Sequence, residues 1–485
     1  MRNATHRLEN RMEGDEYGKM KINEKKNLVK SALFTLDFVL LNLIYYYSLL
    51  YLVRVVNYHE VMTMVMVITI TFFSFRLYNM YVELEHIRFR EIVVKSFIAN
   101  MVSVAGAGIV LTLRQDYGEK MMLTVFPITF LITTTTRIMV KKYITSRYKK
   151  ANILIIGRDE DIRDIVKKFF LKYFRTYNIS WIAPEALTPE AYENRDEVLV
   201  SQNILPDTKE AIVAEILRRR LTYRIIPGNY EILVAASHAG QIYDTFIFNK
   251  MATARFLYRF AKRGMDLLGG GFLFLLSLPL MAGAALALKL ESPGAPILYV
   301  QDRVTMNDRV FRLYKFRSMV PDAEEGTGAV LAERNDARIT RVGSILRTFR
   351  IDELPQVLNV LKGDMSLVGP RPERPEFVQR FNRELPLYDY RHRVRAGLSG
   401  LAQISGYYST TAADKLKHDL YYVEQHSIIL DVVILLRTLE VILSPSKSAG
   451  LEEQQTLEEV LAARKYRIEK DGQGYRFIRE EGVRK

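Results

Sequence analysis

Apolar residues near the start of the chain are concentrated in four segments, at roughly 31–53, 61–75, 93–113 and 121–140. The first segment is long enough to cross about 30 Å of hydrocarbon as a helix, whereas the second is short for a span. Basic residues precede the first segment, lie between the second and third, and follow the fourth. The positive-inside rule therefore places both ends of the bundle in the cytoplasm. The pattern predicts a membrane protein with a polar segment 1–30 and a four-helix transmembrane bundle over 31–145; a soluble helical core is the alternative.

Between about 150 and 250 short apolar runs alternate with amphipathic stretches. ANILIIG (151–157), DEVLVSQ (196–202) and YRIIPG (223–228) are typical of strands, and DEDIRDIVKKFF and KEAIVAEILRRR are typical of helices. This alternation predicts a Rossmann-like α/β middle domain with a small doubly wound parallel sheet. Gly157 ends the first strand, but GRDEDI lacks the further glycines that a dinucleotide motif requires. We therefore expect a packing or spacer domain without a bound dinucleotide.

A fifth apolar stretch, 264–290, is also long enough to span a membrane. Basic residues flank both of its ends, which suits two ends on the same side. Pro279, shortly after Ser277, removes a helix hydrogen bond and bends the helix. We expect a re-entrant helix with a kink at Ser277 and Pro279, and an ordinary kinked span is the alternative. The apolar segment 427–443 suits a helix in the membrane interface and a core helix equally well.

Composition restricts the chemistry that the chain can perform. Its 485 residues contain no cysteine, which excludes disulfides, thiolate nucleophiles, iron–sulfur clusters and zinc sites with cysteine ligands. The net charge of +14 implies an anionic partner, such as nucleic acid, anionic lipid or phosphorylated substrates. Because the basic residues lie beside the spans and around a candidate phosphate site, membrane lipids and substrates account for the charge without a nucleic-acid partner.

Two adjacent carboxylates stand out in the segment IDELPQVLNVLKG (351–363). Pro355 suits a first helical turn and Gly363 suits a helix end, so Asp352 and Glu353 are expected at a helix N-terminus, where anions are stabilised. Their side chains point in different directions and can divide the labour, one attacking and one holding a cation. Simple N-capping by Asp352 is the alternative.

Many basic residues surround these carboxylates in the sequence. Arginine recognises phosphate bidentately, and the stiff turn GPRP (369–372) fixes one arginine in place. Acidic residues for Mg²⁺ beside arginines for phosphates are typical of phosphoryl transfer, and no P-loop motif is present. For any single basic residue a solvated surface charge is the alternative. The candidate phosphate-binding residues are Lys315, Arg317, Arg347, Arg371 and Arg374.

The motifs KFRSM (315–319), LRTFRIDELPQVLNVLKGDMSLVGPRP (346–372) and GLSGLAQISG (397–406) resemble the bacterial sugar transferase family, the monotopic phosphoglycosyl transferases. With the four spans and the middle domain, the whole chain is similar in architecture to the large undecaprenyl-phosphate galactose- or glucose-phosphotransferase type. The resemblance in motif detail covers 255–445, an α-rich monotopic catalytic domain, and the tail 446–485 follows it.

The resemblance implies a two-step transfer at the bacterial inner membrane, on its cytoplasmic side, in exopolysaccharide, capsule or O-antigen biosynthesis. Asp352 matches the family nucleophile: it attacks the β-phosphate of a UDP-hexose, releases UMP and carries the phosphosugar until undecaprenyl phosphate accepts it. Glu353 matches the Mg²⁺-binding position, and Pro279 matches the kink of the re-entrant helix. Lys315, Arg347 and Arg371 match basic catalytic positions. The resemblance favours galactose or glucose and suggests a homodimer.

The chain departs from the family pattern at Ala396, Leu401 and Tyr407, where Pro, Trp and Arg are common. The last departure weakens a phosphate-binding role for that loop, and leaves Tyr407 or Tyr408 to contact nucleotide or sugar. A membrane scaffold and a transporter are the rival functions. The intact carboxylate and arginine set argues against the first, and the few charges within the spans argue against the second. The tail suggests a helix over 456–470 and a small hairpin at DGQG, with surface structure or self-association as its role.

Overall fold

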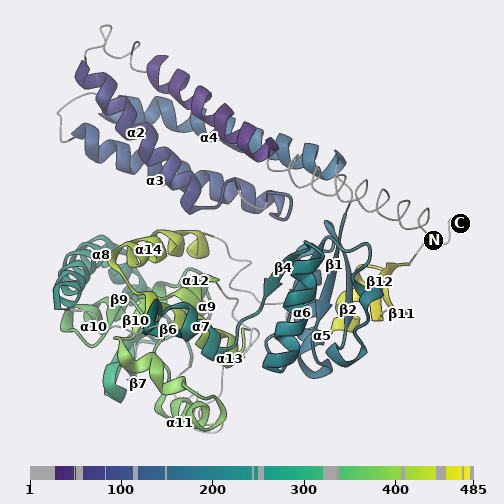
Figure 1. Cartoon of the computed structure of the whole chain (residues 1–485). Helices are drawn as coiled ribbons and strands as arrows, with labels where there is room; N and C mark the ends of the chain where they lie inside the picture. The colour runs from purple at the N-terminus through teal and green to yellow at the C-terminus, as the bar shows by residue number, and fades with distance from the viewer. Residues whose placement is uncertain are drawn as a thin grey trace, which may run out of the picture. The chain divides into compact units, whose positions relative to one another are not determined.

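The computed structural model describes residues 28–47, 50, 58–81, 84–112, 118–147, 150–242, 245–249, 256–320, 336, 338–405, 410–443, 455–471 and 474–480. Contacts divide the chain into two compact units, the first comprising residues 1–226 and 455–485 and the second residues 227–454 (Figure 1). The finer division into five parts that the sequence suggests remains a prediction.

The described part of the first unit begins with four helices, Leu28–Tyr47, α2 (Tyr58–Leu77), α3 (Phe89–Thr112) and α4 (Gly118–Arg147). They form where the sequence has its four apolar segments, and α3 packs against both α2 and α4. By length and composition the helix Leu28–Tyr47 is able to cross a membrane, whereas the apolar part of α2, Met64–Leu77, is shorter. The transmembrane placement of the bundle therefore remains a prediction.

Buried polar side chains face one another between these helices. Arg137 of α4 forms an ion pair with Asp37 of the first helix, with Nη1 and Oδ1 2.8 Å apart, and both side chains are almost completely buried. The rings of Phe75 and Tyr81 lie 5.0 and 5.3 Å from the guanidinium. In apolar surroundings such pairs and hydrogen bonds determine how helices meet. Further buried hydrogen bonds join Tyr45 to Thr71, Thr71 to Ser103, and Asn100 to Thr133.

A six-stranded sheet forms the rest of the first unit. The parallel strands β1 (Ala151–Ile156), β2 (Tyr177–Ile182), β3 (Glu197–Val200) and β4 (Thr222–Ile225) lie in the order β2-β1-β3-β4. Helices α5 (Asp159–Tyr173) and α6 (Pro206–Arg218) connect them, so the predicted alternation of strands and helices is confirmed. Strand β2 was not among the predicted elements.

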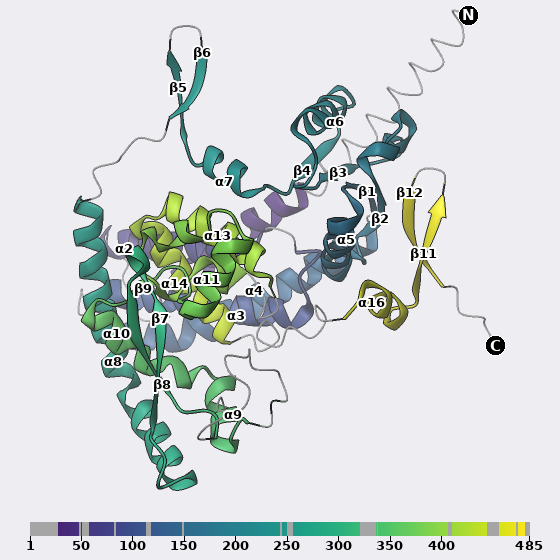
Figure 2. The ribbon, with the colours of Figure 1, turned by 90° about the horizontal axis from the view of Figure 1, so that it is seen from below.

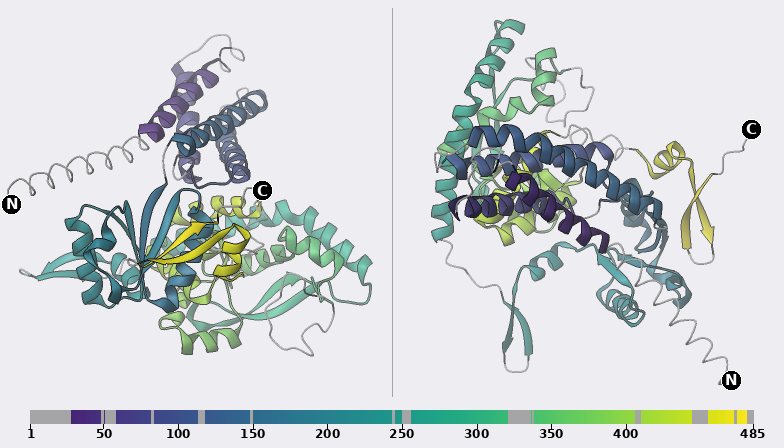
Figure 3. Two further views of the ribbon diagram at one scale, coloured as in Figure 1. Left: turned by 90° about the vertical axis from the view of Figure 1, so that its right-hand side faces the viewer. Right: turned by 90° about the horizontal axis from the view of Figure 1, so that it is seen from above.

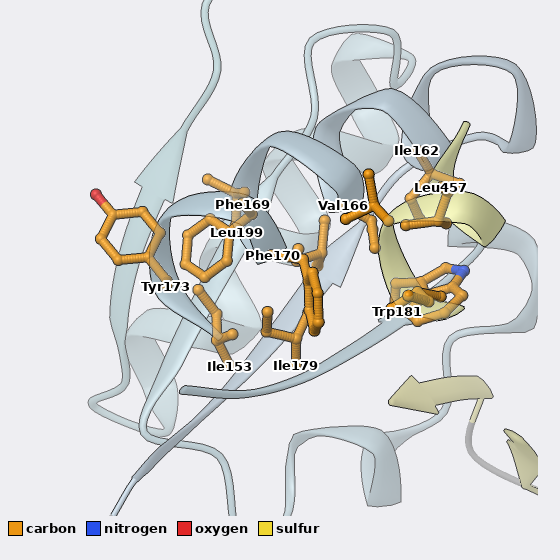
Figure 4. Close-up of a cluster of buried hydrophobic side chains, with 13 residues drawn as sticks. Ile153, Ile162, Val166, Phe169, Phe170, Tyr173, Ile179, Trp181, Leu199 and Leu457 are labelled. Atoms are coloured by element: carbon orange, nitrogen blue, oxygen red, sulfur yellow. The ribbon is translucent and has the colours of Figure 1, made fainter. Parts of the chain in front are cut away.

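The two faces of this sheet are packed by alternate residues of each strand, because successive strand side chains point to opposite sides. Ile153 and Ile155 pack against α5, with Phe170 and Trp181 in the same cluster (Figure 4). Leu154 and Ile156 face the opposite layer, which contains α6. Burial on both faces explains why β1 reads as a continuous apolar run.

The end of the chain completes the same sheet. After the short helix α16 (Leu457–Ala463), strands β11 (Tyr466–Asp471) and β12 (Gly474–Arg479) form a hairpin, and β12 pairs antiparallel with β2 (Figure 3). Trp181 of β2 stacks on Tyr475 with ring centroids 5.4 Å apart. The hairpin suggested at DGQG therefore forms, and the helix suggested over 456–470 stops at Ala463.

Within the described residues, the second unit is rich in helices and contains three small two-stranded sheets, β5–β6, β7–β8 and β9–β10. The β5–β6 hairpin can be followed in Figure 2. Its strands are β5 (His238–Ile242), β6 (Thr245–Asn249), β7 (Leu298–Val304), β8 (Val310–Phe316), β9 (Ser366–Val368) and β10 (Gly397–Ser399). Its helices are α7 (Asn229–Ala235), α8 (Phe256–Glu291), α9 (Arg341–Thr348), α10 (Val357–Lys362), α11 (Pro375–Glu384), α12 (Leu401–Ser405), α13 (Ala412–Gln425) and α14 (Ile428–Ile442).

Helix α8 is a single helix of 36 residues that continues through Pro279. The Ser277 hydroxyl is buried and donates to the Phe274 carbonyl at 3.1 Å, one turn before the proline. By length and composition this is the second helix in the described residues that is able to cross a membrane. Helix α8 has no break at which the chain would turn back toward the cytoplasm. Re-entry into the membrane remains a prediction.

Helix α14, the segment for which the sequence left two interpretations open, packs one face into the second unit. Asp431 is completely buried and accepts from the Lys262 ammonium at 2.8 Å and from the Tyr422 hydroxyl at 2.7 Å. The Lys262 ammonium also donates to the Val368 carbonyl, at the end of β9, at 3.1 Å. The opposite face of α14 exposes apolar side chains, including that of Ile429.

Candidate active site

The two carboxylates lie in a tight turn at the start of α10. Arg350 adopts a left-handed conformation with φ of 55°, and residues Ile351–Gln356 then form a 3₁₀ turn before α10 begins. The N-terminal part of the predicted helix is thus 3₁₀ rather than α, and the left-handed Arg350 separates it from α9. The helix ends at Gly363 with φ of 90°, as the sequence predicts, since glycine adopts this conformation without strain.

A buried asparagine fastens this element to the strand beside it. The Asn359 side chain accepts from the Tyr314 amide at 3.1 Å and donates to the Arg312 carbonyl at 2.8 Å. Strand β8 is therefore held against α10, and Lys315, the residue after Tyr314, is held near the carboxylates.

Glu353 is the carboxylate that is paired. Arg371 Nη2 donates to Glu353 Oε1 at 2.7 Å, and Arg350 Nη1 lies 3.8 Å from Oε2. Burial opposes ionisation of Glu353, but the charges of Arg371 and Arg350 outweigh it and hold its pKa at about 2. Glu353 is therefore ionised at every physiological pH.

Asp352 has the opposite electrostatic setting. Burial and the neighbouring charge of Glu353 raise the pKa of Asp352 to about 6, although Arg347, Lys315 and Arg371 act against that rise. At neutral pH this carboxylate is ionised but poorly solvated. A poorly solvated anion beside cations is suited to attack an electrophile that carries negative charge.

Lys315 stands over an aromatic ring beside the two carboxylates. Its ammonium lies 4.8 Å from the centroid of Tyr299, which is opposite Lys315 in the β7–β8 hairpin. Burial, together with the charge of Arg303, lowers the pKa of Lys315 to about 8. The ammonium is therefore charged at neutral pH and loses its charge as the pH rises above about 8.

Arg303 belongs to the same group but was not among the predicted site residues. Its guanidinium donates to the Gln301 side chain at 2.7 Å and to the Pro372 carbonyl at 3.0 Å. Its Nε is buried without a hydrogen-bond partner among the described residues. Burial and the nearby arginines lower its pKa to about 10. The alternation of β7, which places residues 299, 301 and 303 on one face, was the sequence signal for it.

The remaining predicted basic residues differ in their positions. Arg347, in the last turn of α9, is close enough to lower the pKa of Asp352. Arg374 precedes α11, lies 3.7 Å from Glu376, and is near enough to Arg303 to lower its pKa.

Arg317 does not join this group in the structure. It is buried, and its guanidinium donates to the Pro296 carbonyl at 2.8 Å and the Leu288 carbonyl at 3.1 Å. These contacts fasten β8 to the C-terminal end of α8, where helix carbonyls lack partners within the helix. The geometry thus gives Arg317 a structural role in place of the predicted phosphate contact.

A divalent cation would find few protein ligands here. No group of three or more histidine, aspartate or glutamate side chains that could hold a metal occurs within the described residues. Mg²⁺, however, is commonly bound by one or two carboxylates together with substrate phosphates. The permanently ionised Glu353, beside Asp352, fits that kind of site.

The arrangement as a whole combines one poorly solvated carboxylate, one permanently ionised carboxylate and several cations. The cations are Lys315, Arg303, Arg347 and Arg371. Such a set is able to bind a diphosphate, neutralise its charge and present a nucleophile to phosphorus.

Comparison with known proteins supports this interpretation. Residues 257–445 match the family model described as bacterial sugar transferase. The UDP-N-acetylgalactosamine-undecaprenyl-phosphate N-acetylgalactosaminephosphotransferase of Aeromonas hydrophila is 51% identical over 191 residues, 39% of this chain and 45% of that protein. The UDP-glucose:undecaprenyl-phosphate glucose-1-phosphate transferase of Caulobacter vibrioides is 43% identical over 188 residues, 38% of this chain and 70% of that protein.

A third relative is covered almost completely. The exopolysaccharide production protein PSS of Rhizobium leguminosarum is 40% identical over 186 residues, which make up 37% of this chain and 92% of that protein. By contrast, the chain matches less than half of the Aeromonas protein.

Proposed function

Because the chain belongs to the bacterial sugar transferase family, we propose that it transfers a sugar 1-phosphate from a UDP-sugar to undecaprenyl phosphate, as an initiating step of polysaccharide biosynthesis. The observation that carries the proposal is the contrast between the adjacent carboxylates. Asp352 has its pKa raised to about 6, whereas Glu353, bonded to Arg371 at 2.7 Å, has its pKa held at about 2.

In the first step the ionised Asp352 carboxylate attacks the β-phosphorus of the UDP-sugar. A bond forms between Asp352 and that phosphorus, the bond to the bridging oxygen breaks, and UMP leaves with that oxygen. In the second step a phosphate oxygen of undecaprenyl phosphate attacks the same phosphorus and releases the Asp352 carboxylate. The products are UMP and an undecaprenyl diphosphate sugar, so every atom is accounted for.

The basic residues stabilise the charge that this exchange concentrates at phosphorus. Arg371 and Lys315 lie near both carboxylates and neutralise the donor's diphosphate as Asp352 approaches. Arg303 and Arg347 extend this positive surface. When bound at Glu353, Mg²⁺ would supply further neutralisation of the diphosphate.

The sugar is proposed from the relatives as well as from the sequence. The names of the relatives indicate N-acetylgalactosamine for the Aeromonas protein and glucose for the Caulobacter protein. The sequence resemblance favours galactose or glucose. We therefore include UDP-N-acetylgalactosamine with UDP-glucose and UDP-galactose as candidate donors.

The membrane placement is part of the same proposal. The acceptor's phosphate stays at the membrane surface because its lipid chain stays in the hydrocarbon. A re-entrant α8, bent near Ser277 and Pro279, would hold the active site at that depth on the cytoplasmic side. The exposed side chains of Leu268 and Phe272 on α8 support contact with lipid. The helices of residues 28–147 would then form a multi-pass bundle in the inner membrane.

The decisive experiment measures UMP release by the purified protein from a panel of UDP-sugars with undecaprenyl phosphate and Mg²⁺. We expect release with one or a few of these donors, and none when Asp352 is replaced by asparagine. Turnover of the Asp352→Asn variant at a wild-type rate would exclude the assigned nucleophile. A wild-type protein inactive with every donor would instead favour a scaffold function.

A further inference from the structure

Arg371 lies on an exposed turn, yet its guanidinium must stay on Glu353. It follows β9 within the GPRP turn, and its side chain is 43% exposed. Prolines on both sides restrict the turn, but the Arg371 side chain is long and flexible. The position of its guanidinium therefore depends on how well its own backbone is fixed.

A second arginine makes a direct contact with that backbone. Arg391 Nη2 donates to the Arg371 carbonyl at 2.7 Å. Arg391 belongs to the 3₁₀ turn Tyr388–Arg393, outside the motifs that point to the active site. Its side chain is only 4% exposed, whereas most arginines remain in water.

The other contacts of Arg391 determine the direction in which it donates. Its Nε donates to Asp419 Oδ2 at 3.0 Å, and its Nη1 donates to the Tyr388 hydroxyl at 2.8 Å. Asp419, on α13, is itself buried and balances the charge. Its Nη2, which donates to the Arg371 carbonyl, also lies 2.8 Å from Asp419 Oδ2. Asp419 and Tyr388 together therefore fix the plane of the guanidinium and the direction of that donation.

A buried ion pair of this kind adds little net stability to the fold, which indicates that its directed hydrogen bonds serve a further role. Burying a carboxylate and a guanidinium loses their hydration, and apolar residues of similar volume often stabilise a fold as well or better. What an ion pair supplies, and apolar packing does not, is a directed hydrogen bond to a chosen carbonyl.

We infer that Arg391, oriented by Asp419 and Tyr388, is a positioning residue that holds the backbone of Arg371 so that its side chain reaches Glu353 and the donor's diphosphate. Arg391 does not touch the substrate and acts only through Arg371. This inference rests on the proposed function, since Arg371 has its role there.

The test compares Arg391→Lys and Tyr388→Phe in two backgrounds, wild type and Arg371→Ala. Lysine keeps the charge but cannot make all three directed contacts, and phenylalanine removes one of them. Initial rates of UMP release are measured as kcat and KM for the UDP-sugar, with enough enzyme to follow the slower background. Arg393→Lys is the control, because Arg393 is an exposed neighbour in the same turn whose guanidinium lies 4.1 Å from the Tyr390 ring.

We expect Arg391→Lys to lower kcat/KM about tenfold and Tyr388→Phe a few-fold in the wild-type background, because small misplacements of a positioned group are costly in rate. In the Arg371→Ala background both effects should shrink to less than about twofold, because residues that act through one another are not additive. The control should match its parent in both backgrounds.

Equal losses in the two backgrounds would overturn the inference, since Arg391 would then act on the fold as a whole. Wild-type rates for both folded variants would overturn it too. If Arg391→Lys does not yield folded protein, the Tyr388→Phe pair decides by the same criterion. A wild-type enzyme without activity on any donor would instead refute the proposed function, so the two failures are distinguishable.

Discussion

Glu353 and Arg371 lie 2.7 Å apart, and this contact makes two adjacent carboxylates chemically unequal. Arg371 stabilises the ionised form of Glu353, while Asp352 remains with a raised pKa beside it. The residue that is proposed to attack is therefore the one that gains most from giving up its charge to a covalent bond.

This inequality predicts different phenotypes for two substitutions of similar size. Asp352→Asn should lower UMP release at least about a thousandfold, because the nucleophile itself is lost. Glu353→Gln should retain slow release and require more Mg²⁺, because only a charge near the phosphates is lost. With UDP-sugar radiolabelled in the sugar, denaturing gels should show labelled Glu353→Gln protein and unlabelled Asp352→Asn protein. Label on the Asp352→Asn protein would contradict the assignment.

The pH dependence of the first step should be bell-shaped. Asp352 must be ionised to attack, so the rate should fall as the pH drops below about 6. Lys315 must be protonated to attract phosphate, so the rate should also fall as the pH rises above about 8. In Lys315→Arg the basic limb should move to higher pH, because arginine remains charged, while the acid limb stays in place. An unchanged basic limb would assign it to another group.

Asp352 should also lower the stability of the folded protein. Its pKa is higher in the folded state than in the unfolded chain, so folding is most favoured when it is protonated, and that stability is lost as the pH rises through about 6. At pH 7.5 the free energy of unfolding of Asp352→Asn should therefore exceed that of wild type by on the order of 1–3 kcal/mol, and the variant should unfold at a higher temperature. Near pH 4 the difference should largely disappear. Thermal unfolding in detergent at the two pH values measures it.

The buried pair of Asp37 and Arg137 should be essential to the helical bundle. Asp37→Asn leaves a buried guanidinium without its counter-ion, and such changes cost about 3–5 kcal/mol. Replacing both residues, as Asp37→Leu with Arg137→Met, should recover much of the loss, because no charge then remains buried. The fraction of protein that stays monodisperse after heating in detergent compares the variants. If the double variant is no better than the single one, the directed hydrogen bonds matter more than the charge.

Gly474 should not tolerate a side chain. Its φ is 122°, and a Cβ there would lie 2.4 Å from the Trp181 carbonyl oxygen. Gly474→Ala should separate β12 from β2 and expose the indole that stacks on Tyr475. The change should appear as a red shift of tryptophan fluorescence, because Trp181 is the single tryptophan of the chain. An unshifted spectrum would mean that the hairpin stays docked.

Local sequence patterns indicated the chemistry of the site better than they indicated which residues belong to it. Asp352, Glu353 and Arg371 could be identified because the turn residues around them restrict the backbone in a recognisable way. Arg317 could not be separated from Lys315 by sequence, because residues two apart lie on the same face of a strand. Strand β8 ends at Phe316, and only the contacts of Arg317 with the Pro296 and Leu288 carbonyls show that its side chain turns away from the carboxylates. Arg303 and Arg391 lie outside the motifs. The alternation along β7 was a signal for Arg303, whereas tertiary contacts alone bring Arg391 to the Arg371 carbonyl.

The fold shows the same limit. The strand–helix alternation predicted β1, β3 and β4, because each is a short apolar run followed by turn residues. Strand β2, YNISWI, mixes polar and apolar residues and carries a weaker signal. That the tail joins the sheet beside β2 depends on pairing between segments separated by the entire second unit, which no local pattern encodes.

That pairing has a consequence for how the chain is made. A ribosome releases β1 to β4 long before β11 and β12 exist, so the edge of β2 and the indole of Trp181 wait uncovered while residues 227–454 are synthesised. Nascent sheets with open edges attract other strands. During translation the sheet of the first unit therefore stays incomplete until β12 pairs with β2. Chains that stop early would keep an unpaired, aggregation-prone strand edge that quality-control factors are able to recognise.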